Sequence, residues 1–307
     1  MSSRHAQRGS GFIWRRPAML TQEIKKIALE SHLDYVAIAP VERLAKLPEG
    51  QRPTDILPQA KSVISLGIKI NKGVIIANQR AYQGLRHAIY TYLWHGYGLL
   101  NLHFLDKTAL KIVNRLEKEG FIGYPIGART VEDLSKPYDF FHRNVAIAAG
   151  LGEIGFHSQI LTPDDGPRVR LAAVLTSAEL EPDPMYGGPK LCDPTECASK
   201  SGKGEPICKG ICPVQAIGSE ENVEIEIGSK KFKSAQLDQF KCMWGNWGLH
   251  QDALAIKPIP MPEKVTFNEV FEALKKRDPV QVVELMIPGR GNYCDRCIVE
   301  CPVGRVG

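Results

Sequence analysis

Eight cysteines lie between positions 192 and 301, and the first 191 residues of this 307-residue chain contain none. They form two groups, Cys192-x4-Cys197-x10-Cys208-x3-Cys212-Pro213 and Cys294-x2-Cys297-x3-Cys301-Pro302, with Cys242 standing alone between them. Spacings of two and three residues can point sulfurs at one metal centre. Disulfide frameworks are typical of small secreted chains, so in a chain of this length the pattern favours metal ligation in a reducing compartment.

Both cysteine groups end in Cys-x3-Cys-Pro, which resembles the two-cluster bacterial ferredoxins. In that fold the cysteine before the proline ligates the other cluster. The resemblance therefore implies two [4Fe-4S] clusters, one held by Cys192, Cys197, Cys208 and Cys301, the other by Cys212, Cys242, Cys294 and Cys297. The alternative is two zinc sites of four cysteines each, but zinc sites usually pair Cys-x2-Cys motifs and only one such motif is present.

The composition predicts an ordinary globular chain of about two domains. Hydrophobic residues make up 43% and charged residues 24%, which excludes wholesale disorder. No apolar run approaches the length of about 18 residues that a transmembrane helix needs. The formal net charge of +5 is a weak argument for nucleic-acid binding, and two clusters with their thiolates would lower it to about +1.

Helical and strand patterns alternate in the first part of the chain. Apolar runs at 35–39, 63–70 and 171–176 predict buried strands, and a helix is expected from Thr21, as its N-cap, onward. Further helices are expected over about 99–119 and 144–151, the first ending at Gly120. This alternation predicts an α+β or α/β layered domain over residues 20–180.

The composition changes at Glu181-Pro182-Asp183-Pro184, which we take as a domain boundary. We therefore expect a first domain over 19–184 and a second over 185–307. The second contains a hairpin signal around Gly228 and a capping box formed by Thr266 and Glu269, which starts a helix of about 266–277; Asp278-Pro279 starts a shorter one. Val265 and Val270 occupy the positions of a hydrophobic staple.

Residues 1–18 are polar and basic, and we expect them to be an extension outside the fold. Arg15-Arg16 resembles a twin-arginine export signal. Such a signal needs an apolar stretch after the arginines, and here a charged helix start follows instead. The expected location is therefore the cytoplasm.

The run Ala148-Ala149-Gly150-Leu151-Gly152-Glu153-Ile154-Gly155 is followed by Leu161-Thr162-Pro163 and Gly166-Pro167-Arg168-Val169-Arg170-Leu171. Together with the eight cysteines, these motifs resemble the cobalamin-dependent iron–sulfur reductases, which comprise the reductive dehalogenases and the epoxyqueuosine reductases. Glu153 and the Gly-Pro-Arg-Val-Arg-Leu run favour the dehalogenase branch, because epoxyqueuosine reductases more often have Trp-Ile-Gly-Lys in the glycine turn. The resemblance spans roughly residues 20–307 and is strong only at 144–180 and at the cysteines.

This resemblance implies a nitroreductase-like core that binds a base-off corrinoid, followed by a two-cluster ferredoxin-like domain. Co(II) would be reduced to Co(I), which would then reduce an electrophilic carbon or a bound halogen. The residues that the resemblance implies for corrinoid binding are Gly150, Leu151, Gly152, Glu153, Gly155, His157, Arg168 and Arg170. We expect the glycines to let a flat macrocycle approach the backbone closely.

A side-chain acid would supply the proton. Dehalogenases use a tyrosine beside a basic residue, which implies Tyr138 with Arg143; Asp133 and His142 are the nearby alternatives. Tyr138 is otherwise simply a core aromatic residue. The chain departs from the epoxyqueuosine reductases here, because the position of their acid corresponds to Lys136.

The leading hypothesis is a cytoplasmic corrinoid-dependent reductase of a small electrophilic substrate. Its electrons would come from an acidic ferredoxin or flavodoxin, which Lys200, Lys203 and Lys209 would help to dock, unless these lysines belong to a solvated loop. A second hypothesis is an electron-transfer protein without a corrinoid. A third is an epoxyqueuosine reductase, which alone among the three would bind a nucleic acid, tRNA.

Overall fold

The computed structural model describes residues 17–128, 141–250, 258–276 and 293–304. The elements before residue 180 are α1 (Pro17–Glu30), β1 (Tyr35–Pro40), η1 (Val41–Leu44), α2 (Pro53–Ile56), β2 (Ser62–Lys69), α3 (Lys72–Tyr82), η2 (Arg86–Ala88), α4 (Ile89–Leu93), η3 (Trp94–Gly98), η4 (Leu100–Leu105), α5 (Asp106–Lys118), β3 (Gly123–Ile126), α6 (Phe141–Ala148), β4 (Glu153–Ile154), β5 (Ile160–Leu161) and β6 (Val169–Thr176). Those beyond it are α7 (Pro194–Ser201), α8 (Ile207–Gly210), β7 (Val223–Ile227), β8 (Lys230–Ser234), α9 (Gln239–Asn246), α10 (Phe267–Lys275) and α12 (Arg296–Val299). The mixed helix-and-sheet class expected from the sequence is confirmed.

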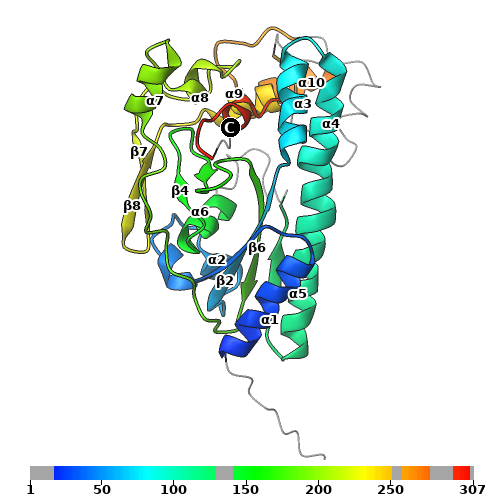
Figure 1. The fold of residues 1–307 in the computed structure, drawn as a ribbon, viewed down its shortest axis with the longest axis vertical. Helices are drawn as coiled ribbons and strands as arrows, with labels where there is room; N and C mark the ends of the chain where they lie inside the picture. Colours follow the sequence, from blue (N-terminus) through cyan, green and yellow to red (C-terminus); the bar gives the residue numbers. More distant parts are fainter. Residues whose placement is uncertain (1–16, 129–140, 251–257, 277–292, 305–307) are drawn as a thin grey trace, which may run out of the picture.

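The centre of the fold is a four-stranded antiparallel sheet with the strand order β1-β2-β6-β3 (Figure 1). Its two central strands, β2 and β6, pair along their whole length, from Ser62 opposite Thr176 to Lys69 opposite Val169. The three strands expected from the sequence are confirmed as β1, β2 and β6. The strand β3 is too short, and too exposed along Gly123–Ile126, to give a clear apolar signal.

Both faces of the sheet are buried, which explains why its strands are continuous apolar runs rather than alternating ones. Ile38, Leu66 and Val174 face a core that α1 and α5 complete. Their neighbours on the strands, such as Ala39 and Val63, face a second core against α6. Figure 1 shows α1 and α5 on one side of the sheet and α6 on the other.

The helix expected over about 99–119 is longer and less regular than its periodicity indicates. It runs without interruption from Ile89 to Lys118, and the segments η3 and η4 between α4 and α5 are π-helical. Its last part, α5, has the expected apolar face and is followed by Gly120 with φ +83°. A π-helical turn inside an α-helix is often found at a functional site, because it changes which side chains and carbonyl groups face a neighbour.

The predicted start of the helix at Thr266 is confirmed, whereas the predicted start of the first helix at Thr21 is wrong. Both halves of the capping box of Thr266 and Glu269 are present at the start of α10. Thr21 is not an N-cap, because α1 begins at Pro17 and Thr21 lies buried within it. Its hydroxyl group instead accepts a hydrogen bond of 2.9 Å from the amide of Glu181. The helix expected at Asp278-Pro279 lies outside the described residues.

The segment that we expected to separate two domains is firmly held by the first of them. Asp183 accepts hydrogen bonds from Lys25 Nζ at 2.6 Å and from the amide of Ile38 at 2.8 Å. The β7–β8 hairpin, which turns at Gly228 as expected, packs Ile227 and Phe232 into the same core as α6. The two halves of the chain therefore share a hydrophobic core.

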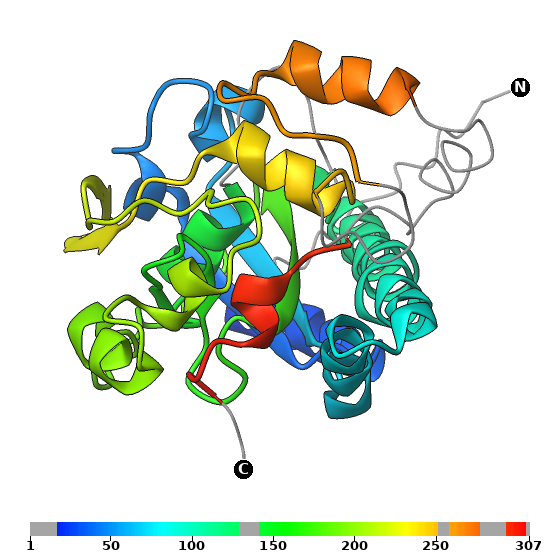
Figure 2. The same ribbon diagram turned by 90° about the horizontal axis from the view of Figure 1, so that it is seen from above.

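The cysteine-bearing segments pack at one end of the sheet (Figures 1 and 2). There α12, near the end of the chain, contacts both α8 and α3. None of the helices in the described ranges combines the length and the apolar character that crossing a membrane requires.

Candidate functional site

The first of two cysteine-lined cavities has a volume of about 210 Å³. Its lining includes Cys192, Cys197, Cys208 and Cys301, together with Phe156 and His157 from the turn between β4 and β5 and Leu161 of β5. A single water needs roughly 10–15 Å³ on such a measure, so this space accepts a group of many atoms.

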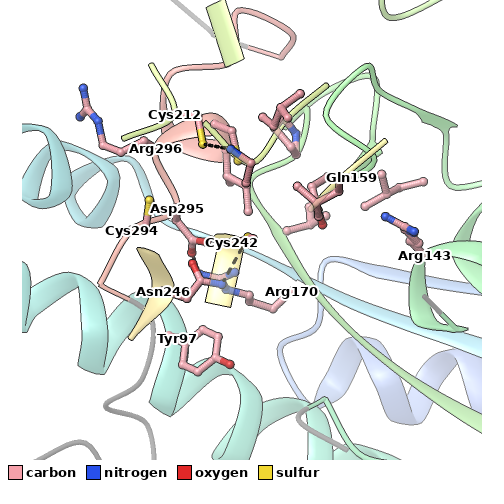
Figure 3. Close-up of a pocket in the computed structure, with 18 of the residues that line it drawn as sticks. Tyr97, Arg143, Gln159, Arg170, Cys212, Cys242, Asn246, Cys294, Asp295 and Arg296 are labelled. Atoms are coloured by element: carbon pink, nitrogen blue, oxygen red, sulfur yellow. Dashed lines mark hydrogen bonds and ion pairs between the residues drawn. The ribbon is translucent and has the colours of Figure 1, made fainter. Parts of the chain in front are cut away.

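The second cavity, of about 270 Å³, lies between the cysteine-bearing segments and the start of β6 (Figure 3). Cys212, Cys242, Cys294 and Cys297 line one side of it. Tyr97, Asn101, Arg143, Gln159 and Arg170 line it from the sheet-containing half of the chain. The last cysteine of each sequence group thus lies with the other group's cavity: Cys301 lines the first and Cys212 the second.

The chemistry of these sulfurs suits ligands of an iron–sulfur centre. Burial raises the pKa of the Cys294 thiol to about 12 and that of Cys301 to about 11, so these thiolates need a cationic centre to form at neutral pH. Across the parts of the chain that are described, no three His, Cys, Asp or Glu side chains are grouped as a single-ion site.

Several N–H groups already point at the sulfurs. The amides of Phe156, Ile207 and Ala216 donate to Cys192 Sγ, Cys197 Sγ and Cys212 Sγ at 3.4, 3.5 and 3.3 Å. The side-chain amide of Asn246 lies 3.8 Å from Cys242 Sγ. Such donors are typical of the surroundings of cluster thiolates, where they help to set the reduction potential.

Arg168 and Arg170 of the Gly-Pro-Arg-Val-Arg-Leu run connect the sheet to the last cysteine group. Arg168 donates to the carbonyl groups of Cys301, at 2.9 Å, and of Val303, and it lines neither cavity. Arg170 pairs with Asp295, between Cys294 and Cys297, at 2.5 Å. We expected both arginines to bind a corrinoid; Arg168 is engaged with this loop instead, whereas Arg170 also lines the second cavity.

Sequence patterns missed the partners of Arg170. Tyr92 donates to Asp295 at 2.7 Å, and Arg170 Nε donates to the carbonyl of Gly96 at 2.8 Å. The guanidinium also lies 4.9 Å from the centre of the Tyr97 ring. Gly96 and Tyr97 belong to the π-helical segment η3. The only signal in the sequence was the position of Asp295 between two cysteines.

Two glycines of the turn lie against the backbone of the protein itself. Neither Gly150 nor Gly152 lines either cavity. A Cβ on Gly150, where φ is +90°, would overlap the carbonyl oxygen of Pro184, and one on Gly152 would overlap that of Leu161. These two glycines are therefore required by close packing of the protein against itself, and their contact with a macrocycle stays a prediction.

The remaining residues of the turn surround the first cavity or pack behind it. Leu151 packs against the core next to α6. Glu153 accepts a hydrogen bond of 3.1 Å from the amide of Leu191, directly before Cys192. The Cβ of a larger residue at Gly155 would press on the ring of His157 at 2.9 Å. His157, expected at the corrinoid, lines the first cavity instead.

Two of the expected catalytic residues line the second cavity. Arg143 donates to the carbonyl group of Ser158. His142 Nε2 lies 2.8 Å from the carbonyl oxygen of Gly127, and burial lowers the pKa of this histidine, so its ring is neutral near pH 7. Tyr138 and Asp133 lie outside the described residues, so the Tyr138–Arg143 pair stays a prediction.

The lysines that interleave the first cysteine group are largely paired locally. Lys200 lies 2.5 Å from Glu196, and Lys209 forms an ion pair with Glu205. Of the three, only Lys203 has no carboxylate partner among the described residues. This pairing lowers the positive charge available to a docking partner.

Comparison with known proteins relates the chain to one group of reductases. No protein-family model matches it. It is 34% identical over 123 residues to tetrachloroethene reductive dehalogenases of Dehalobacter restrictus and Desulfitobacterium hafniense. These matches cover 39% of this chain and 19% of each relative, so the chain spans about a fifth of their length.

Solved structures share the fold at low sequence identity. The catabolic reductive dehalogenase NpRdhA in complex with 3-bromo-4-hydroxybenzoic acid gives a TM-score of 0.52 at 13% identity, over 96% of this chain and 39% of that one. An epoxyqueuosine reductase with a tRNA stem loop gives 0.49 at 16% identity, over 93% and 65%. The chain is thus similar in sequence, over 123 residues, to reductive dehalogenases, and it shares the fold of a solved reductive dehalogenase.

Proposed function

We propose that this chain is a corrinoid-dependent iron–sulfur reductase of the reductive dehalogenase type. The observation that carries the proposal is the second cavity, where four cysteines face polar side chains of the sheet-containing half across a space of about 270 Å³. An electron carrier and a substrate-reducing group would therefore be neighbours. The first cavity, lined by the other four cysteines, would hold the second cluster of an electron path.

We assign the two [4Fe-4S] clusters to these two cavities in the same four-plus-four division that the ferredoxin resemblance implies. What supports this assignment is the donor set of buried thiols, the space between them and the N–H groups that point at four of the sulfurs. Thiolate-bound clusters persist in a reducing compartment, which supports a cytoplasmic location. A ferredoxin or flavodoxin is the proposed electron donor.

A corrinoid would occupy the side of the second cavity away from the cysteines. Asn101, Gln159 and Tyr97 supply hydrogen-bonding groups that match the amide-bearing rim of such a ligand. The described residues enclose about 270 Å³, which is below the usual 300–1,000 Å³ of small-molecule sites and is shared with a cluster, so the corrinoid would extend beyond this cavity. When bound, the corrinoid supplies a strongly reducing metal centre.

The chain's own residues would position that group and balance the charge. Arg143 and Arg170 both line the cavity, but Asp295 in the same lining balances the charge of Arg170. Arg143 would therefore be the residue that favours an anion leaving the substrate. The overall reaction takes an organohalide, two electrons and one proton to the reduced carbon compound and a halide ion; the carbon–halogen bond breaks and a carbon–hydrogen bond forms. The electrons would come from the external donor, and the clusters, when bound, would supply one-electron transfer.

Metal analysis tests this proposal first. We expect anaerobic purification with iron, sulfide and cobalamin to yield about eight iron atoms and one cobalt per chain. Gln159→Leu, which removes one hydrogen-bonding group from the cavity, should weaken cobalamin binding about 3- to 10-fold. Gln22→Leu, on the exposed face of α1, is the matched control and should leave it unchanged.

The outcomes separate the alternatives. Eight iron atoms without bound corrinoid would favour an electron-transfer protein. Zinc in place of iron would contradict the cluster assignment altogether. The iron-loaded protein with bound cobalamin can be assayed with a panel of chlorinated and brominated alkenes and phenols. Failure to release halide from any of them would rule out the dehalogenase reaction.

A further inference from the structure

His157 is a buried histidine that the proposed electron path leaves unexplained. It follows β4 in the glycine turn and is only 3% exposed. His157 lines the first cavity together with Cys192, Cys208 and Cys301. It is therefore part of the wall that faces the four sulfurs.

The hydrogen bonds of the ring fix its tautomer. The amide of Gln159 donates to His157 Nδ1 at 3.3 Å, so Nδ1 carries the lone pair and the hydrogen is on Nε2. Burial, together with the charge of Arg143, lowers the pKa of His157 to about 4, which keeps the ring neutral near pH 7. The imidazole thus has one N–H group to donate, at Nε2.

Within the described residues, His157 Nε2 is buried and has no hydrogen-bond partner. A buried donor without an acceptor destabilises a fold, so a retained one indicates an acceptor that belongs to the site. The opposite edge of the ring is occupied, because Nδ1 meets Gln159 and Cε1 lies next to Gly155. The cavity of the four cysteines is the space that His157 is known to line.

The rest of the turn is arranged around the same group. The amide of Phe156, one residue earlier, donates to Cys192 Sγ at 3.4 Å. Gly155 leaves room for the ring of His157, since a Cβ there would lie 2.9 Å from Cε1. The third glycine of the turn therefore permits the imidazole to occupy its place.

We propose that His157 Nε2–H donates a hydrogen bond to a sulfur of the cluster held by Cys192, Cys197, Cys208 and Cys301, and so raises the reduction potential of that cluster. The proposal rests on the iron–sulfur part of the proposed function. Reduction adds a negative charge to the cluster, and an N–H donor stabilises the more negative state. His157 is a tuning residue in this assignment, distinct from the substrate and the corrinoid.

The test is a redox titration followed by electron paramagnetic resonance on the iron-loaded protein. The signal that a Cys192→Ser variant loses identifies the first cluster. His157→Met removes the donor, and His157→Gln, of similar size, retains one. We expect about a tenfold shift of the reduction equilibrium in His157→Met, equivalent to about 59 mV downward, and a substantial recovery in His157→Gln.

Two controls show whether the shift is specific. The second cluster in the same samples should keep its potential. Gln22→Leu, on the exposed face of α1, lies outside the lining of both cavities, so it should leave the potential of the first cluster in place.

A measurement on the unaltered protein covers the case in which the variants fail to fold. With ¹⁵N-labelled histidine, pulsed resonance on the first cluster's signal should show coupling to one imidazole nitrogen. If both clusters are present but the first shows no such coupling, the role of His157 is overturned and the proposed function stands. The same holds if the first cluster has equal potentials in His157→Met, His157→Gln and the natural protein. A chain that binds no iron would overturn the proposed function itself.

Discussion

At the scale of single residues, Gly152 tests the packing explanation of the glycine turn. A methyl group there would overlap the carbonyl oxygen of Leu161, which belongs to the backbone of β5 and cannot rotate away. We expect Gly152→Ala to lower the free energy of unfolding by about 3 kcal/mol, at the upper end of overpacking costs. Thermal unfolding of the anaerobic, iron-loaded protein measures the change.

Gly73 in α3 is the matched control, because no atom lies within 4 Å of the position of its absent Cβ. Gly73→Ala should stabilise the protein by about 0.5–1 kcal/mol, since alanine is the better helix former. If Gly152→Ala melted at the same temperature as the natural protein, the turn would have space for a ligand after all, and the macrocycle explanation would return.

Sequence patterns located the important residues of the site but not their partners. The eight cysteines, the glycine turn, and Arg168 and Arg170 at the start of β6 are recognisable because each has a local spacing. Their partners are remote in the chain: Arg170 pairs with Asp295, 125 positions away, and Gly152 meets Leu161 across a hairpin. Only folding brings such pairs together, so a single sequence could not predict that the arginines hold the cysteine loop.

At the scale of elements, the contact of β6 with the Cys294–Cys297 loop depends on one buried ion pair. Arg170 and Asp295 are 9% and 6% exposed, and Tyr92 completes the network. Asp295→Asn keeps a residue that tolerates the observed φ of +50° but leaves the guanidinium without its anion. We expect a loss of about 3–5 kcal/mol in stability and faster release of iron from the second cluster.

A double-mutant cycle isolates the pair. Adding Arg170→Met to Asp295→Asn removes the unpaired charge, so the double variant should recover part of the stability lost in the single one. Glu196→Gln, which breaks the exposed pair with Lys200, should change neither stability nor iron release. Strictly additive effects of the two core substitutions would show that the pair does not hold the loop.

The regular elements were predictable, and the irregular one at the site was not. Apolar runs identified β1, β2 and β6, because both faces of this sheet are buried. The 3.6-residue periodicity identified α5 but not the π-helical segments before it. A π-helical turn shifts the period locally, and here it presents the Gly96 carbonyl to Arg170, so the deviation occurs where the helix meets the site.

At the scale of the whole molecule, α7 and α8 differ from the sheet in what holds them in place. Two large hydrophobic clusters enclose the sheet. By contrast, α7 has eight residues and none of them is buried, while α8 has four and buries only Cys208. Helices this short are not stable on their own, so we infer that the bonds from Cys197 and Cys208 to a cluster keep them folded.

Iron removal should therefore unfold one end of the molecule and spare the other. We predict that anaerobic chelation increases amide hydrogen exchange at least tenfold in α7 and α8, a change of about 1.4 kcal/mol or more in local stability. Amides of β2 and β6 should keep their protection, because their hydrogen bonds lie between two cores that contain no metal ligand. Exchange followed by mass spectrometry on loaded and iron-free protein reports both regions at once. Equal loss of protection in β6 would mean that the arginine contacts make the sheet depend on the clusters as well, and unchanged exchange in α7 would mean that no metal holds it.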